Sequence, residues 1–137
     1  MQFSPDGRTF YTCDSAEQEI LAFDHDPVAG TLTGRRVFAS TYEFNGYPDG
    51  STVDSEGCLW TCLWDASRVV RFTPDGAVDQ VITLAAPRPT SCTFGGDDLK
   101  TLFITTARAG MSFPALDSRP LSGSLFAISV DVPGLPA

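Results

Sequence analysis

The stretch GYPDGSTVDSEGCLW, residues 46–60, combines a carboxylate-bearing turn, a short strand, a second turn and an aromatic strand within fifteen residues. Weaker copies lie upstream and downstream of it, and aligning the three copies places Phe3, Val53 and Phe94 in register. A chain that repeats one such unit is typical of a solenoid or a propeller. A feature that distinguishes one copy from the others is then the place to look for chemistry.

Each copy predicts a set of antiparallel strands. A turn follows the registered residue, and after it comes an aromatic strand centred on Tyr11, Trp60 or Phe103. A further strand rich in β-branched and aromatic residues follows at 19–24, 68–72 and 124–128, and a fourth is present in two copies, at 34–39 and 77–84. Four strands in a unit that recurs after 50 and then 41 residues are typical of a β-propeller blade.

The sequence therefore predicts an all-β fold, a partial β-propeller of about three four-stranded antiparallel blades, roughly residues 1–40, 41–84 and 85–137. No helical periodicity is sustained for ten residues, and the 12 Gly and 10 Pro suit strands joined by many turns. Closed propellers typically have about four to eight blades, so we expect ring closure to need further blades.

Composition limits the classes of partner. The 137 residues are 42% hydrophobic and 19% charged, with a net charge of −8. An acidic chain repels phosphate backbones and anionic lipid surfaces, so neither nucleic acid nor a membrane is expected as a partner. No apolar run approaches the roughly 20 residues needed to span a bilayer. A small molecule or another protein is the favoured partner.

The four cysteines are expected to be free thiols of a cytoplasmic protein. Cys58 and Cys62 lie on one predicted strand, where about 3.3 Å per residue separates them by about 13 Å, beyond the roughly 7 Å limit for a disulfide. A zinc site would need paired Cys-x-x-Cys motifs or several histidines. The single histidine, His25, is expected to lie in a solvated turn.

Asp49 is the candidate site residue that the repeat selects. The second copy opens its inner strand with Pro-Asp-Gly at 48–50 and the third with Pro-Thr-Ser at 89–91, so Asp49 and Thr90 are equivalent and only one is a carboxylate. Hard divalent cations prefer oxygen ligands with net negative charge. Asp49 is therefore predicted as a ligand of such a cation, and the adjacent Gly50 leaves room beside it.

A plain turn is the alternative for Asp49, because Asp-Gly is among the commonest turn dipeptides. Asp6 and Asp75 are also followed by Gly, and both are expected in hairpin turns between strands. Asp49 instead opens a strand directly after Pro48. That position favours a functional role.

A series of ordered motifs covers essentially the whole chain, among them YPDG at 47–50, RVVRF at 68–72, RPTS at 88–91 and LFITTAR at 102–108. In these motifs the sequence resembles the SMP-30/gluconolactonase/regucalcin-like family of sugar lactonases. The resemblance implies a six-bladed propeller about twice the length of this chain, of which this is the C-terminal half. It also implies one divalent cation in the central channel and hydrolysis of sugar lactones.

The resemblance implies that the cation is held by a glutamate near the N-terminus, an asparagine of an inner strand and the aspartate of Pro-Asp-Gly. Only the last falls in this chain, as Asp49. The asparagine would belong to an Asn-Gly pair just before the residue that matches Met1. The expected site for Ca²⁺, or for Zn²⁺, Mg²⁺ or Mn²⁺, is thus incomplete in this chain, and Met1 is expected to be internal to a longer protein.

The predicted function is that of the C-terminal portion of a metal-dependent lactone hydrolase, in which metal-activated water opens the ring. Asp49 would act first as a ligand and second as a catalytic base, since a carboxylate bound to a cation is a weaker base. No Gly-x-Ser-x-Gly elbow indicates a serine hydrolase. We expect the chain to be inactive without the missing N-terminal half or self-association; the alternative is a non-catalytic propeller fragment or a self-associating interaction module.

The remaining aromatic and arginine side chains could have a structural role or a role in the site. Trp60, Tyr11 and Phe103 are expected to pack between blades. Trp64, at the end of its strand, either packs likewise or faces a sugar at the channel mouth. Arg108 and Arg119 flank a long loop and either frame an entrance or are simply solvated; these are arginines of the third predicted blade.

Overall fold

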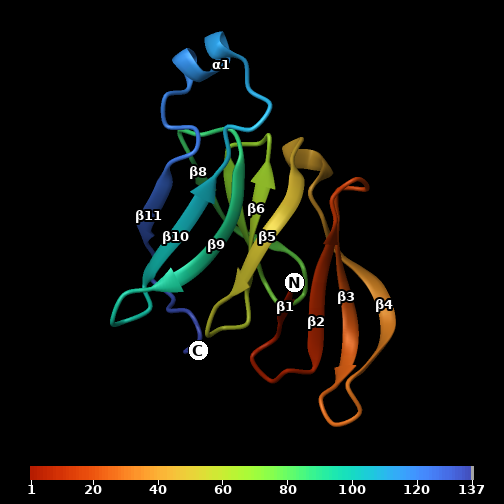
Figure 1. Ribbon diagram of the computed structural model, residues 1–137. Coiled ribbons are helices and arrows are strands. Elements are labelled where there is room, and N and C mark those ends of the chain that lie inside the picture. The colour runs from red at the N-terminus through yellow and green to blue at the C-terminus, as the bar shows by residue number, and fades with distance from the viewer. Residues whose placement is uncertain (137) are drawn as a thin grey trace.

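A computed structural model describes residues 1–136 as three antiparallel β-sheets that lie side by side (Figure 1). The first sheet contains β1 (Gln2–Phe3), β2 (Thr9–Asp14), β3 (Glu19–Asp26) and β4 (Thr31–Ser40). The second contains β5 (Tyr47–Val53), β6 (Leu59–Trp64), β7 (Arg68–Phe72) and β8 (Val78–Thr83). The third contains β9 (Pro89–Gly95), β10 (Thr101–Thr106) and β11 (Leu125–Ser129). In each sheet, consecutive strands are neighbours.

The predicted all-β class is confirmed, and the predicted strands correspond to β2–β4, β6–β8, β10 and β11. Among residues 1–136 the sheets do not close on themselves, so the number of blades stays a prediction. Two short helices were not predicted: the 3-10 helix η1 (Tyr42–Phe44) and α1 (Phe113–Ser118). Both are too short to produce a hydrophobic periodicity, and α1 begins because Ser112 Oγ accepts a hydrogen bond from Ala115 N–H at 3.4 Å.

The second sheet is buried on both faces. Five of the six residues of β6 are buried, which explains the continuous apolar run LWTCLW in place of an alternating pattern. One face packs against the first sheet and the other against the third, in two separate clusters of buried side chains. The first cluster includes Tyr11, Ile20, Leu59, Leu63 and Phe72, and the second includes Trp60, Cys62, Ile82, Leu102 and Ile104.

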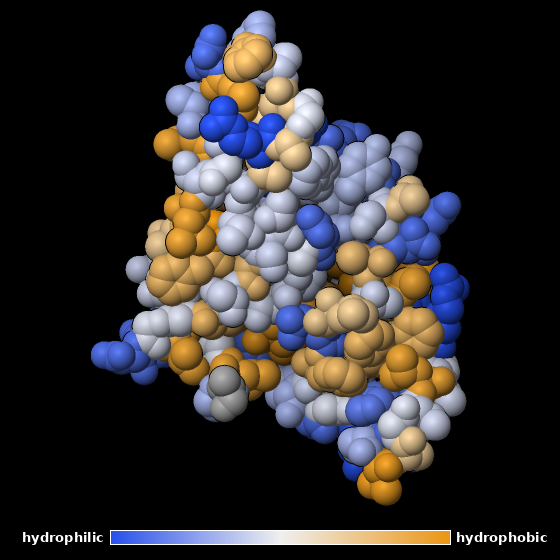
Figure 2. All heavy atoms as spheres, viewed as in Figure 1, coloured by the Kyte–Doolittle hydropathy of each residue, from blue (hydrophilic) through white to orange (hydrophobic). Residues whose placement is uncertain are grey.

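Two faces have no neighbouring sheet within residues 1–136. The open face of the first sheet carries Phe3, Phe10 and Phe23, whose rings follow one another at centroid distances of 5.1 and 6.3 Å. Figure 2 shows apolar side chains exposed over this sheet. The third sheet exposes Leu125 and part of Phe103. The expectation that aromatic residues pack between sheets therefore holds for Tyr11 and Trp60, whereas Phe103 lies on an open face.

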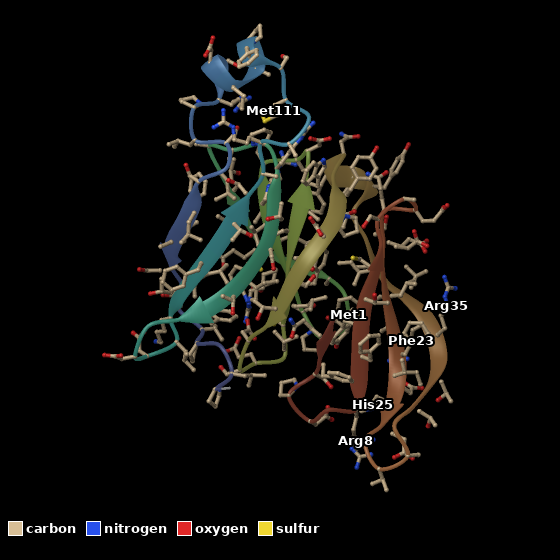
Figure 3. The ribbon with its side chains drawn as sticks, in the orientation of Figure 1. Met1, Arg8, Phe23, His25, Arg35 and Met111 are labelled. Atoms are coloured by element: carbon tan, nitrogen blue, oxygen red, sulfur yellow. The ribbon has the colours of Figure 1, made fainter. Side chains whose placement is uncertain are left out.

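His25 was predicted in a solvated turn, and that prediction is wrong. His25 belongs to β3, where it pairs with Leu32 of β4, because the hairpin of these two strands extends further than its turn residues suggest (Figure 3). Its Nδ1 lies 2.7 Å from the carbonyl oxygen of Gly7, and its ring lies 4.8 Å from that of Phe3. The side chain is thus a half-buried structural residue.

The cysteines are free thiols, as predicted, with Cys58, Cys62 and Cys92 buried and Cys13 half-buried. Desolvation raises the pKa of the Cys58 thiol, which keeps it protonated and unreactive. No helix among residues 1–136 has both the length and the apolar character required to cross a membrane.

A buried carboxylate fixes the turn between β5 and β6. Asp54 is 0% exposed, and its Oδ1 accepts hydrogen bonds at 3.0 Å from the backbone N–H groups of Glu56 and Cys58. Its Oδ2 accepts hydrogen bonds at 2.8 Å from Trp60 Nε1 and Arg71 Nε. The Val-Asp-x-x-Gly-x-Leu-Trp pattern of the sequence is thus a structural unit.

Arg71 extends this network across the second sheet. Its guanidinium also binds Glu56 at 2.8 Å and Asp79 at 2.6 Å, and it lies 5.7 Å from the centre of the Trp60 ring. Burial alone would lower the pKa of Arg71, but the hydrogen bonds that its guanidinium donates to three carboxylates raise it. Arg71 therefore stays charged at every pH at which the protein folds.

We expect Asp54→Asn to lower the free energy of unfolding by about 1.5–3 kcal/mol, because the amide cannot accept all the hydrogen bonds that the buried carboxylate accepts, whereas Arg71 keeps its ion pairs with Glu56 and Asp79. Chemical denaturation followed by circular dichroism measures the loss. Asp97→Asn is the matched control, since Asp97 lies exposed in a turn, and it should leave the unfolding midpoint nearly unchanged. Equal midpoints for the two variants would contradict the role given to Asp54.

Candidate functional site

Asp49 lies in a β-bulge near the start of β5. Pro48 pairs with Leu63 and Ser51 pairs with Thr61, so Asp49 and Gly50 together face the single residue between those partners on β6. A bulge of this kind redirects side chains at the end of a strand. The carboxylate that the repeat comparison selected is therefore held at an irregularity of the sheet, whereas Asp6 and Asp75 lie in turns, as predicted.

The strand β9 has a corresponding irregularity. Pro89 pairs with Thr106 and Ser91 with Thr105, which leaves Thr90 as the extra residue. Thr90 Oγ1 lies 2.7 Å from Thr105 Oγ1. Each of the two inner strands thus has one extra residue near its start, with a carboxylate at this position in one and a hydroxyl in the other.

Gly50 allows the two inner strands to approach. A Cβ atom at this position would lie 2.6 Å from Cα of Ser91, closer than real Cβ contacts allow. On the other side of β5, Gln2 Nε2 donates a hydrogen bond to the carbonyl oxygen of Ser51 at 2.8 Å. The first strands of the three sheets therefore lie together, and β5 and β9 both begin at the end of the molecule that carries α1 (Figure 1).

A pocket of 340 Å³ surrounds Asp49 and is lined by Ser15, Tyr47, Pro48, Asp49 and Trp64. Ser15 Oγ donates a hydrogen bond to the carbonyl oxygen of Pro48 at 2.7 Å, which ties the end of the first sheet to β5. Trp64 pairs with Tyr47 across β5 and β6 and so reaches the same pocket. Trp64 thus lines the same pocket as Asp49, and its contact with a sugar stays a prediction.

Desolvation by the surrounding atoms raises the pKa of Asp49 above its ordinary value, although the side chain reaches solvent, and the backbone N–H of Gly50 opposes this shift. No side chain of residues 1–136 donates a hydrogen bond to its carboxylate. An under-coordinated carboxylate in a partly dehydrated pocket favours binding of a cation or a proton.

The donor set around Asp49 supplies one charged oxygen. Within residues 1–136, no group of three or more His, Cys, Asp or Glu side chains is arranged to hold a metal ion. The Asp49 carboxylate suits a hard divalent cation, and Ser15 and Tyr47 add neutral hydroxyl groups to the same pocket. A complete coordination sphere would need further oxygen ligands from outside these residues.

Arg88 is a residue that the sequence analysis missed as a site component. Its guanidinium lies 4.9 Å from the centre of the Trp64 ring, and its Nε donates to Asp65 Oδ1 at 2.6 Å. Its Nη1 donates to the carbonyl oxygen of Ala109, in the segment before α1. The Arg-Pro-Thr-Ser motif marks this position in the sequence, but its partners lie 21 to 24 residues away.

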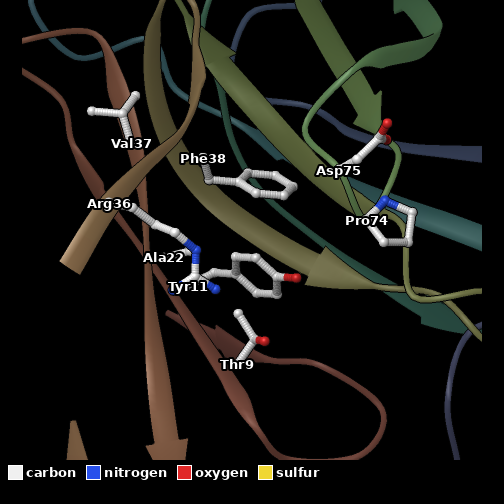
Figure 4. A pocket seen from close by; sticks show the side chains of 8 residues that line it. All are labelled: Thr9, Tyr11, Ala22, Arg36, Val37, Phe38, Pro74 and Asp75. Atoms are coloured by element: carbon white, nitrogen blue, oxygen red, sulfur yellow. The ribbon is translucent and has the colours of Figure 1, made fainter. Parts of the chain in front are cut away.

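A second pocket, of 220 Å³, lies between the first and second sheets and is lined by Tyr11, Arg36, Phe38 and Asp75 among others (Figure 4). Its ionic groups are already engaged: Arg36 binds Asp24 at 2.8 Å, and Asp75 accepts a hydrogen bond from Thr73. This pocket therefore offers no free carboxylate, and the Asp49 pocket is the better candidate for chemistry.

We expect Asp49→Asn to stabilise the protein at pH 7. Because the folded-state pKa of Asp49 is raised, ionisation costs more in the folded state than in the unfolded state, and the amide removes that cost. The gain should disappear as the pH falls below the ordinary value of 3.8, where the wild-type carboxyl group is neutral in both states.

Asp75→Asn is the control with the opposite sign, because the hydrogen bond from Thr73 lowers the pKa of Asp75. This variant should be less stable than the wild type at pH 7. The difference in the free energy of unfolding should become smaller as the pH falls. Unfolding midpoints from pH 3 to pH 7 measure both effects. A pH-independent difference for Asp49→Asn would contradict the desolvated environment described for its carboxylate.

Comparisons with known proteins agree with this arrangement of strands. Residues 1–108 match the family described as the SMP-30/Gluconolactonase/LRE-like region. The chain is 41% identical to 6-deoxy-6-sulfogluconolactonase of Pseudomonas putida, over 98% of this chain and 46% of that protein. It is 39% identical to regucalcin of Danio rerio, over 99% and 47%, and 39% identical to L-arabinolactonase of Azospirillum brasilense, over 90% and 40%.

Solved structures give the same result. The calcium-binding protein regucalcin of Agrobacterium tumefaciens superposes with a TM-score of 0.91 at 30% identity, over 98% of this chain and 46% of that one. A gluconolactonase of Xanthomonas campestris superposes with a TM-score of 0.70 at 30% identity, over 96% and 36%. The chain spans about half the length of the curated relatives it matches. This protein belongs to the SMP-30/gluconolactonase/LRE-like family.

Proposed function

We propose that this chain forms the C-terminal portion of a metal-dependent sugar lactone hydrolase. The observation that carries the proposal is the under-coordinated Asp49 carboxylate, held in the β5 bulge beside Trp64. Family membership supports it, since the relatives include proteins named for the hydrolysis of a sulfogluconolactone and of L-arabinolactone. The substrate would accordingly be a sugar lactone, and the free thiols suit a reducing compartment such as the cytoplasm.

The proposed architecture is half of a six-bladed propeller, with blades at about residues 1–40, 41–84 and 85–137. Two observations support it. The first strands of the three sheets lie together, as the inner strands of blades do, and the chain matches only about half of its relatives' length. Further blades would cover the open faces of the first and third sheets, where Phe3 is 44% and Leu125 is 63% exposed.

Asp49 would perform two tasks in the complete protein. It would contribute one oxygen ligand to a divalent cation such as calcium, with the remaining ligands supplied from outside this chain. The bound cation supplies a Lewis acid that polarises the lactone carbonyl and acidifies water. Asp49 would also accept a proton from the attacking water, more weakly because its lone pairs are shared with the cation. The Trp64 ring beside it would pack against the sugar.

A second candidate function is a non-catalytic module that associates with itself. The two unpartnered faces favour this alternative, because apolar sheet faces and unpaired strand edges promote association. Light scattering after size-exclusion chromatography distinguishes a self-associating module from a portion of a larger enzyme. A discrete dimer of the 137-residue chain without lactonase activity would favour the module, whereas a monomer or an aggregate would favour a portion of a larger enzyme.

We expect the 137-residue chain alone to hydrolyse gluconolactone no faster than buffer, because Asp49 is the single acidic side chain that lines its pocket. A pH-stat assay with and without added Ca²⁺ measures the rate. Saturable, metal-dependent turnover by this chain would contradict the incomplete site.

When the chain is joined to the missing blades, lactone hydrolysis should appear, and Asp49→Ala should lower kcat/KM by about 100-fold or more. Asp75→Ala is the control, since Asp75 lies in an exposed turn, and it should retain activity. The genomic sequence upstream offers a separate check: an Asn-Gly pair directly before Met1 and a glutamate near the true start are expected. If both are absent, the lactonase assignment fails.

A further inference from the structure

A pocket of 460 Å³ lies beside the Asp49 pocket, under the segment that carries α1. Three separate parts of the chain line it: the turn after β6, the loop before β9 and the excursion between β10 and β11. Figure 3 shows Met111, one of the lining residues, at the end of the molecule that carries α1. The polar side chains that line this pocket are Asp65, Arg88, Ser112, Ser118 and Arg119.

Arg88 lines one side of this pocket and binds the connection between β10 and β11 above it. Its backbone carbonyl accepts a hydrogen bond from Ala107 N–H at 2.8 Å, and its Nη1 donates to the carbonyl oxygen of Ala109. With Nε bound to Asp65, the Nη2 group is left without a hydrogen-bond acceptor among residues 1–136. Arg88 is therefore held in place by contacts within the chain, with one edge of its guanidinium still free to donate hydrogen bonds.

Arg119 supplies a second guanidinium from the C-terminal side of α1. It is exposed, and no carboxylate of residues 1–136 lies within ion-pair distance of it. The lining therefore contains two arginines and one carboxylate, a net positive charge in a chain whose net charge is −8. Ser112 Oγ accepts a hydrogen bond from Ala115 N–H, which leaves its own O–H free to donate.

The position of Arg88 connects this pocket to the candidate site. Its guanidinium stacks on Trp64 at 4.9 Å, and Trp64 lines the pocket of Asp49. This contact thus joins a residue that lines one pocket, Trp64, to a residue that lines the other, Arg88. A substrate whose reacting group lies at Asp49 would pass Trp64 and place its far end beside Arg88 and Arg119.

We propose that the pocket of Arg88 and Arg119 binds an anionic group at the end of the substrate remote from the lactone carbonyl, so that the enzyme acts on acidic sugar lactones. This rests on the proposed lactonase function. Guanidinium groups bind the oxygens of phosphate, sulfonate and carboxylate groups through paired hydrogen bonds. The shared chemistry is a terminal oxyanion, and the hydroxyl of Ser112 adds a further donor to it.

Binding of three sugars tests the proposal: glucose 6-phosphate, glucuronate and glucose. Calorimetry is performed on the 137-residue chain and on the protein with its missing blades. We expect the better charged probe to bind about tenfold more tightly than glucose, as for a charge-assisted hydrogen bond. Arg119→Gln should abolish most of that preference. The probe that binds best distinguishes a phosphate from a carboxylate source.

Arg35→Gln is the matched control, because Arg35 is also exposed and lies on β4, away from α1 (Figure 3). It makes the same change in charge and should keep the preference for the charged probe. Equal affinity for charged and neutral sugars would overturn the proposal, as would a preference that Arg119→Gln leaves intact. Circular dichroism verifies that both variants are folded.

Measuring lactone hydrolysis distinguishes the proposed anion pocket from the lactonase function on which it rests. If gluconolactone is hydrolysed but neither charged probe is preferred, the anion pocket is wrong and the lactonase function stands. If no lactone is hydrolysed by any form of the protein while Arg119 still confers the preference, the pocket binds anions and the lactonase function is wrong. If the proposal holds, kcat/KM for the lactone that carries the preferred anionic group should exceed that for gluconolactone, and Arg119→Gln should lower this ratio by about tenfold.

Discussion

The rest of the structure depends on the hydrogen bonds that the buried carboxylate of Asp54 accepts, above all from Arg71. This carboxylate is removed from water, a cost of several kcal/mol for an ion, and is stabilised there because two backbone N–H groups, Trp60 Nε1 and Arg71 all donate to it. The carboxylate joins the β5–β6 turn to β7, and through Arg71 to Asp79 on β8. The chain end returns to the same turn, where Ser55 N–H donates to the carbonyl oxygen of Pro133.

This network matters beyond the second sheet because that sheet supports the other two. Its two faces form separate apolar clusters with the first and third sheets, so the relative placement of β1, β5 and β9 follows from a correctly formed second sheet. The approach of β5 and β9 then requires Gly50 opposite Ser91. Asp49 is positioned as the neighbour of that contact, in a bulge that a regular ladder would not contain.

The candidate site lies at the end of the molecule where β5 and β9 begin (Figure 1). Here the strands leave the tightly packed sheets, and Asp49, Trp64 and Arg88 reach adjoining pockets. The opposite end carries ordinary turns, in which carboxylates such as Asp6 bond their own neighbours, here Ser4 Oγ at 2.6 Å. Asp49 has no side-chain donor at one end, whereas carboxylates such as Asp6 at the other end are bound by a neighbouring side chain, and the shared Asp-Gly dipeptide does not reveal this physical difference.

Much of the fold could be predicted from sequence because strands and turns are local. Aromatic strands that follow Gly-containing turns in each copy identified the strands around Tyr11 and Trp60, and comparison of the copies singled out Asp49 against Thr90. The boundaries of β3 were less accessible, since His25 is kept in the strand by its pairing with Leu32. The exposure of Phe103 likewise depends on which sheets are present to cover it.

The sequence by itself thus determined the strand order, the class of fold and the distinctive carboxylate, all of which follow from patterns of short range. Only the tertiary structure decided that Asp54 binds Arg71, that Trp64 lines the pocket of Asp49 and contacts Arg88, and that Arg119 rather than Arg108 lines the pocket of Arg88. These partners lie far apart in the chain. Their contacts are set by strand register and by packing between sheets, which no local pattern specifies.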